Sequence, residues 1–423
     1  MIAKIKKSLY FVVASYFGFF AAIVLKRWKP RIIVITGSNG KTTLLQLVES
    51  QLKEKAKFSH HANSALGIPF DILNIKRTTL TPDEWPRLFL LALVNSFAHI
   101  PSEKIYIVEA DSDRPNEGKF LAKLLKPEVT IWMSSARSHT ENYDELVQRK
   151  IFLSIEQAIA YEYGHFIENT SHLSIINEEN PFIIEQKPRT KSEVIGITKK
   201  DHLQRYTINN FTTSFRIDNT EYNFPYALPE NIFYSISACI QLLKYLNIPL
   251  QSFNNFTLPP GRNSILKGIK NITIIDSSYN ANLDSMEVIL EMFNKIDCEK
   301  KWLVISDMVE LGKEETEEHQ KLGLILQSVT ADRLILMGPR VIQYTYPVVQ
   351  KQNQLKTGII IFTKPTEVLE YINNNITGNE TILFKGARFL EGIIENILEN
   401  KNDVAKLCRR EKAWQERRNQ LGI

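Results

Sequence analysis

The sequence has few cysteines and no long run of charge of one sign. Cys239, Cys298 and Cys408 are the only cysteines among 423 residues, and no two of them form a CxxC pair. This excludes a disulfide framework and a cysteine-based zinc ribbon, and it fits a reducing compartment such as the cytoplasm. The net charge is only +5, and the basic residues form no long stripe outside the termini. We therefore expect no nucleic-acid binding.

Internal repeats and low-complexity tracts are also missing. Hydrophobic residues make up 43% of the chain and charged residues 23%, which is typical of a folded globular protein. The length exceeds that of one ordinary domain and indicates two or three compact ones.

The longest uncharged stretch lies near the N-terminus, at Ser8–Leu25, with basic residues on both sides. It is at the short end for a membrane span, and the symmetric basic flanks give no orientation. No secretory cleavage signal is convincing. Three interpretations remain open: a single span, a helix lying in the membrane surface, and a helix packed on the protein itself. We expect membrane contact through residues 8–25, with the remaining chain on the cytoplasmic side.

After Pro30, apolar runs alternate with amphipathic ones, which predicts a mostly parallel sheet with helices on both faces. The predicted strands are 31–36, 105–109 and 129–134. The predicted helices are 42–53, 117–125, 144–163 and 232–246. Polar and aromatic residues alternate over 202–226, which indicates an antiparallel hairpin at a domain edge.

The segment Phe256–Asn263 (FTLPPGRN) cannot continue a helix and predicts a linker. Beyond it the alternation restarts, with strands expected at 272–276, 302–307, 333–337, 358–362 and 381–384. This predicts a second, smaller doubly wound α/β domain. Residues 403–420 predict one charged helix, either with a solvated face or with a second contact to anionic lipid. The expected domains are 1–30 (apolar helix), 31–258 (central) and 259–423 (C-terminal).

The strongest local signal is Gly37-Ser38-Asn39-Gly40-Lys41-Thr42-Thr43, between a predicted strand and a predicted helix. Glycines let the backbone wrap a phosphate, and the helix N-terminus adds positive potential. In such loops the lysine neutralises the β- and γ-phosphates and the following hydroxyl binds Mg²⁺. We therefore predict that all seven residues contribute to an ATP site. The spacing departs from the general P-loop, because Ile35 stands where that motif has its first glycine.

This short loop resembles that of the Mur ligase family, and the resemblance is closest to its MurF type. Further matches follow in order over both α/β regions, which is more specific than any single motif. They are Asn63–Pro69 (NSALGIP), Gly261-Arg262, Ile275–Met286 (IDSSYNANLDSM), Ser306–Gly312 (SDMVELG) with His319, and Lys385–Arg388 (KGAR).

The resemblance implies a central P-loop domain and a Rossmann-like C-terminal domain, and it assigns metal ligands. Glu109 matches the family's magnesium-binding glutamate, His139 a histidine for a second metal, and Lys150 a lysine that is carbamylated in many members. Each has an ordinary alternative: a surface acid, a loop histidine and an exposed helix lysine. Phe152 stands where the family has a glutamate after this lysine.

In the C-terminal region, Arg262 and Asp276 match residues that close over ATP, and Asn280 matches one near the adenine. Asn63, His319, Lys385 and Arg388 match positions that we assign to substrate contact. Structural roles are equally compatible with His319 and with the Lys385–Arg388 run, and Asp276 could instead terminate a strand.

The implied activity is that of an ATP- and Mg²⁺-dependent ligase, which activates a small-molecule carboxylate as an acyl phosphate and joins it to an amine. Peptidoglycan precursors are the substrates of the resembling type. Only residues 1–30 precede the predicted central domain, in place of the family's UDP-binding domain. Asp111 and Asn116 stand where the family favours glycine. These departures leave two alternatives: a polymerising amino-acid ligase at the membrane, or a non-catalytic nucleotide-binding subunit.

Overall fold

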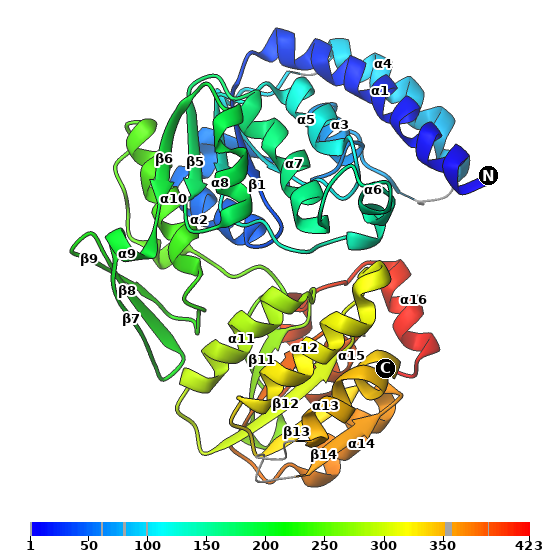
Figure 1. The fold of residues 1–423 in the computed structure, drawn as a ribbon, viewed down its shortest axis with the longest axis vertical. Helices are drawn as coiled ribbons and strands as arrows, with labels where there is room; N and C mark the ends of the chain where they lie inside the picture. Colours follow the sequence, from blue (N-terminus) through cyan, green and yellow to red (C-terminus); the bar gives the residue numbers. More distant parts are fainter. Residues whose placement is uncertain (1, 61, 79–81, 99, 352–357, 388) are drawn as a thin grey trace. The chain divides into compact units, whose positions relative to one another are not determined.

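The computed structural model describes residues 2–60, 62–78, 82–98, 100–351, 358–387 and 389–423. The chain divides into two compact units (Figure 1). The first contains residues 1–136, 145–202 and 234–255, and the second contains residues 137–144, 203–233 and 256–423. The predicted domain boundary at residue 258 stays a prediction, although the chain enters the last segment of the second unit at Phe256.

The first unit is built on a parallel six-stranded sheet with the order β2-β3-β1-β4-β5-β6. Its strands are β1 (Arg31–Thr36), β2 (Ala56–Phe58), β3 (Ile105–Ala110), β4 (Val129–Trp132), β5 (Leu173–Asn177) and β6 (Glu193–Ile197). Nearly all residues of β1, β3, β4 and β5 are buried, as expected where helices cover both faces. The predicted α/β class is confirmed.

Helices surround this sheet (Figure 1). They are α2 (Lys41–Leu52), α3 (Gly67–Ile72), α4 (Trp85–Ala98), α5 (Glu117–Leu125), α6 (Asp144–Gln148), α7 (Ile155–Glu168), α8 (Pro181–Gln186), α9 (Lys199–His202) and α10 (Ile232–Tyr245). The predicted helix over 144–163 is wrong, because α6 and α7 are separate. Lys150 adopts a left-handed φ of 57°, and the Ser154 side chain caps α7 by accepting from Gln157 N.

The apolar N-terminal segment forms α1 (Ile2–Trp28), which packs along α3 and α4. Ala14, Phe17, Ala21 and Val24 are fully buried. The Phe17 ring lies 4.6 Å from that of Phe70. Leu9–Trp28 is long and apolar enough to cross a membrane, with a third of its residues buried. Part of the helix therefore belongs to the core of the first unit.

Polar contacts hold α1 at Tyr10 and at its C-terminal end. The Tyr10 hydroxyl donates to Glu117 Oε1 at 3.0 Å, and Trp28 Nε1 donates to the Glu103 carbonyl at 2.6 Å. Arg27 Nη1 donates to the Ser96 carbonyl at 2.6 Å. These bonds and the buried apolar stripe hold α1 in one orientation on the unit.

The second unit has a six-stranded sheet with the order β10-β11-β15-β12-β13-β14. Only the edge strand β10 (Ser264–Lys267) is antiparallel to its neighbour. The other strands are β11 (Thr273–Ser277), β12 (Lys300–Ser306), β13 (Arg333–Met337), β14 (Ile359–Phe362) and β15 (Glu380–Lys385). Two apolar clusters cover the two faces of this sheet, so the predicted second doubly wound region is confirmed.

Helices α11 to α16 pack around this sheet, and a small sheet joins the unit. The helices are α11 (Leu283–Lys295), α12 (Glu315–Gln327), α13 (Tyr346–Lys351), α14 (Pro365–Asn375), α15 (Leu390–Ile397) and α16 (Lys412–Gln420). The small antiparallel sheet contains β7 (Leu203–Asn209), β8 (Thr212–Ile217) and β9 (Thr220–Phe224). The predicted hairpin over 202–226 is thus extended by a third strand.

The C-terminal segment departs from the single charged helix predicted over 403–420. A 3₁₀ helix covers Lys401–Lys406, and α16 begins only at Lys412. Between them, Leu407 and Cys408 are buried and Arg409 has a left-handed φ of 55°. Burial of two apolar side chains by this turn outweighs the helical preference of the charged residues around it.

The packing of α1 gives a stability prediction. We expect Phe17→Ala to lower the free energy of unfolding of the first unit by about 3–5 kcal/mol, because a fully buried ring leaves a cavity. Phe19→Ala is the matched control, since its ring is 64% exposed on the same helix. Thermal unfolding of both variants measures the difference. Equal melting temperatures would show that α1 does not pack on the unit in solution.

Candidate nucleotide site

The predicted phosphate loop joins β1 to α2 at the carboxyl edge of the first sheet. Gly37 has a φ of 123°, and a Cβ there would lie 2.5 Å from the Ser134 carbonyl oxygen. Gly40 caps α2 in a left-handed conformation with a φ of 81°. Only glycine adopts both conformations without strain. The two glycines therefore allow the tight turn that the sequence predicts.

Hydrogen bonds to the segment after β4 hold the loop in place. Asn39 N donates to Ser134 Oγ at 2.8 Å, and that hydroxyl donates to the Asn39 carbonyl at 2.7 Å. Ser38 Oγ donates to the Ala136 carbonyl at 2.8 Å. The loop is thus pre-formed, with the N-terminus of α2 at its end, which is the arrangement that binds phosphate.

Lys41 is the first residue of α2, and its ammonium group is buried. It donates to the Gly37 carbonyl at 2.5 Å and pairs with Asp111 Oδ2 at 2.7 Å. Burial alone would lower the pKa of Lys41, but the carboxylates of Asp111 and Glu109 outweigh it and raise the pKa above its ordinary value. Lys41 therefore stays a cation, as its predicted role at a phosphate requires.

Asp111 lies in the loop after β3 and is itself held from two sides. The Tyr163 hydroxyl donates to Asp111 Oδ1 at 2.6 Å, and Ser112 N donates to the same oxygen at 2.9 Å. The Asp111 carboxylate therefore supplies the negative charge beside the Lys41 ammonium group. The sequence marks Asp111 only as a departure from the family pattern, and gives no sign of the partner Tyr163.

Thr42 and Glu109 bring two oxygen donors together beside the loop. Thr42 Oγ1 donates to Glu109 Oε1 at 3.2 Å, and Glu109 N donates to Ser59 Oγ at 2.9 Å. Glu109 is the last residue but one of β3, the neighbour of β1 in the sheet. A hydroxyl and a carboxylate are hard oxygen ligands of the kind that Mg²⁺ takes alongside phosphate. These residues therefore fit the predicted metal role.

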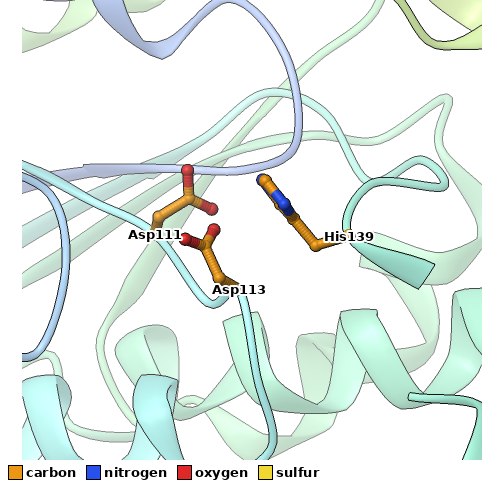
Figure 2. Close-up of side chains that lie close together, drawn as sticks. All are labelled: Asp111, Asp113 and His139. Atoms are coloured by element: carbon orange, nitrogen blue, oxygen red, sulfur yellow. The ribbon is translucent and has the colours of Figure 1, made fainter. Parts of the chain in front are cut away.

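Two further acids follow Glu109, in the loop after β3. The carboxylates of Asp111 and Asp113 lie side by side, with ligand oxygens within 4.8 Å (Figure 2). His139, also drawn in Figure 2, belongs to the 137–144 segment of the second unit. There its Nδ1 lies 2.7 Å from Glu310 Oε2, and this hydrogen bond lowers the pKa of Glu310. Its role as a metal ligand stays a prediction.

Lys150 lies in the turn after α6 and is exposed, rather than within a long helix. In the described part of the chain its side chain forms no ion pair. The structure thus puts Lys41, Thr42 and Glu109 together and leaves Lys150 in solvent. Its carbamylation stays a prediction.

A second group of predicted residues lies around the end of β11. Lys385 Nζ donates to the Asn280 carbonyl at 2.6 Å, and the Arg262 guanidinium lies over the Tyr279 ring at 4.6 Å. Asp276 is fully buried and accepts from the Ser278 hydroxyl at 2.6 Å. Arg262, Asp276, Asn280 and Lys385 are therefore neighbours in the second unit, although they come from three separate sequence segments.

Burial shifts the pKa of both ionisable groups at the centre of this cluster. It lowers the pKa of Lys385 to about 7, and the positive charge of Arg262 adds to this effect. It raises the pKa of Asp276 to about 6, against the hydrogen bonds from Ser278. Near neutral pH, both groups therefore lie close to their titration points.

The remaining predicted substrate residues differ in exposure. The Asn63 carbonyl accepts from Asp111 N at 2.8 Å, so Asn63 lies beside the nucleotide loop. His319 is fully buried; its Nε2 accepts from Met308 N and its Nδ1 donates to the Glu315 carbonyl. This geometry favours the structural alternative for His319. Arg388 lies outside the described residues.

Arg409 also belongs to the group of residues around the end of β11, and the sequence did not predict it. Its guanidinium donates to the carbonyls of Ser278 and Tyr279 at 3.1 Å and 2.5 Å, and pairs with the buried Glu391 at 3.2 Å. It fixes the loop that carries Asn280. No motif marks it, because it stands in the segment interpreted as a charged helix.

A pre-formed phosphate turn, a buried lysine and a threonine–glutamate pair at the edge of a parallel sheet define a nucleotide-binding α/β enzyme. Two family models match this chain: the Mur ligase middle domain at residues 35–229, and the Mur ligase, glutamate ligase domain at residues 261–388. The chain belongs to the Mur ligase family and is of the MurF-like type. It is an ATP-dependent ligase that forms a carbon–nitrogen bond.

Named relatives and solved structures agree with this. The UDP-N-acetylmuramoyl-tripeptide–D-alanyl-D-alanine ligase of Borreliella burgdorferi is 24% identical over 387 residues, covering 87% of this chain and 74% of the relative. The fold is similar to MurF ligase from Thermotoga maritima in complex with ADP, with TM-score 0.71, 19% identity and coverage of 96% and 84%. MurF from Acinetobacter baumannii gives TM-score 0.73, 18% identity and coverage of 91% and 80%.

The Lys41–Asp111 pair predicts a change in nucleotide affinity. We expect Asp111→Asn to bind ATP about tenfold more tightly, because phosphate no longer has to displace a carboxylate from Lys41. Tyr163→Phe keeps the carboxylate and serves as the control, with a smaller change. Titration calorimetry measures both. Weaker binding by Asp111→Asn would contradict this prediction.

The lowered pKa of Lys385 predicts a pH effect on stability. A lysine whose pKa falls on folding binds fewer protons in the folded state, so its contribution is full above the ordinary value of 10.5 and declines as the pH falls towards 7. Between about pH 10 and pH 7, wild-type protein should lose several degrees more in melting temperature than Lys385→Met. Lys267→Met, on an exposed β10 lysine, should follow wild type. Parallel curves for all three proteins would refute the prediction.

Proposed function

We propose that this ligase joins a muramoyl-peptide-like carboxylate to the amine of a dipeptide such as D-alanyl-D-alanine, in the synthesis of a cell-envelope precursor. The observation that carries it is the pre-formed loop with Lys41, Thr42 and Glu109 in one place. The names of the relatives supply the substrate class. ATP, when bound, supplies the phosphoryl group that converts the carboxylate into an acyl phosphate.

The residues of the first unit act by position and charge. Backbone N–H groups at the start of α2 would hold the phosphates of bound ATP, and Lys41 would offset their negative charge. Lys41 would have to exchange its ion pair with Asp111, at 2.7 Å, for the phosphates of bound ATP. We assign these residues to orientation and charge stabilisation, which provide most of the catalysis in phosphoryl transfer.

We further propose Mg²⁺ as the cation of this site, held by Thr42 and Glu109. The hydrogen bond between their oxygens at 3.2 Å supports this, because both atoms face the same small volume. His139 and Lys150 remain the proposed ligands of a second ion. In the second unit, we assign Arg262, Asp276 and Asn280 to nucleotide contact, and Lys385 and Arg388 to substrate contact; Asn63 is the corresponding proposal in the first unit.

We place the ligase in the cytoplasm, at the inner face of the cell membrane, in contact with it through residues 8–25. The apolar, partly exposed helix α1 supports this location. Two other functions stay as alternatives: a polymerising amino-acid ligase, and a nucleotide-binding subunit without turnover. The second is favoured by one observation, the carboxylate of Asp111 on the phosphate-loop lysine.

Release of ADP and phosphate tests the activity. We expect turnover only when a muramoyl tripeptide and D-alanyl-D-alanine are both present, and a loss of at least about a hundredfold in Lys41→Ala, because a buried cation at the phosphates is removed. Lys53→Ala, an exposed lysine just after α2, should keep full activity. Full turnover by Lys41→Ala would remove the basis of the assignment. Mass spectrometry of the product separates a single addition from a polymer.

A further inference from the structure

Helices α1 and α4 lie side by side on the outside of the first unit (Figure 1). Their contact is tight: the Tyr16 hydroxyl donates to the Phe89 carbonyl at 3.0 Å, and the Phe17 and Phe89 rings stack at 5.2 Å. The two helices therefore form one layer, and both have a side that is turned away from the sheet.

The outer sides of both helices are apolar. On α1 the exposed apolar residues are separated by three and seven positions, and on α4 they follow the i, i+3, i+4, i+7 pattern, so they form one stripe along each helix. We call these residues the α1/α4 face: Leu9, Val12, Phe19, Leu90, Leu93, Val94 and Phe97, each between 44% and 64% exposed. Soluble surfaces seldom gather so many large apolar side chains in one place, so this face needs a partner.

The charges around this face indicate the kind of partner. No Asp or Glu occurs before Glu49, and none occurs in α4. Lysines precede the apolar part of α1 at Lys4, Lys6 and Lys7, and Lys26, Arg27 and Lys29 follow it. Apolar helices with basic ends suit a bilayer with anionic headgroups. A second copy of the chain fits poorly, because basic ends would meet basic ends in either orientation.

The buried side of α1 determines how such contact is made. A spanning helix would have to expose Ala14, Phe17, Ala21 and Val24, which are fully buried, and to give up the bond from Tyr10 to Glu117. A helix that lies in the membrane surface keeps all of these contacts. Only its outer stripe then enters the lipid, together with the stripe of α4.

We propose that the α1/α4 face docks flat on a bilayer containing anionic lipids and holds the first unit at the membrane without a span. The proposal rests on the membrane location given in the proposed function and specifies the surface that makes the contact. Lipid binding does not require catalysis, so the two can be tested separately. The helix α4 is part of the docking surface, which the uncharged stretch at residues 8–25 alone does not reveal.

Sedimentation with vesicles tests the proposal, using purified full-length protein and vesicles of phosphatidylcholine with or without phosphatidylglycerol. We expect wild type to sediment with the anionic vesicles and to be released by salt. Val12→Glu/Phe97→Glu, with one charge on each helix, should bind at least about tenfold more weakly. Ile151→Glu/Leu153→Glu is the matched control, because these side chains are 57% and 88% exposed outside the face. It should bind like wild type.

Further measurements check that the variants fold and separate flat docking from a membrane span and from a dimer. Nucleotide binding and thermal unfolding show that the variants are folded, and Lys41→Ala should still bind vesicles even though it lacks turnover. Alkaline carbonate should release the bound protein from the anionic vesicles. Protein that stays with the vesicles would overturn flat docking in favour of a span. A wild-type dimer in light scattering that Val12→Glu/Phe97→Glu converts to a monomer would overturn the lipid assignment, as would equal vesicle binding by both double variants.

Discussion

Parallel strands bring their carboxyl ends to one edge of a sheet, and the nucleotide site of this ligase depends on that constraint. The strands β3, β1 and β4 are adjacent, so the segments that follow them meet beside the loop at Gly37. Ser134, after β4, holds the loop backbone, and Glu109, at the end of β3, meets Thr42. A side chain at position 37 would collide with the Ser134 carbonyl, so this arrangement requires glycine there.

The alternation of apolar and amphipathic runs predicted most of the fold, because buried parallel strands leave an unmistakable pattern. The helix Glu117–Leu125 and the strand Arg333–Met337 have the predicted bounds. The predicted helix bounds are wrong where a local cap or the burial of a side chain interrupts the helical periodicity. Ser154 begins a new helix in a region that is helical on both sides, and Leu407 with Cys408 breaks the C-terminal helix by turning inward.

Individual site residues were predictable where a motif fixes them on the backbone, as for Lys41 and Thr42. Glu109 was predictable because a strand end determines its place. The partnership of Lys41 with Asp111 was not, since it joins side chains 70 positions apart in the sequence and depends on Tyr163 as a third member. The same holds for Arg409, whose contacts with the loop after β11 follow from an unexpected turn.

The pairing of Lys41 with Asp111 also bears on how a spent nucleotide leaves. A buried ammonium group without a counter-charge costs several kcal/mol. In the structure Asp111 supplies this counter-charge to Lys41, and it could do so again after a nucleotide had left. Anion binding at Lys41 would then be an exchange of one negative group for another, so the ammonium group would keep a counter-charge with and without nucleotide.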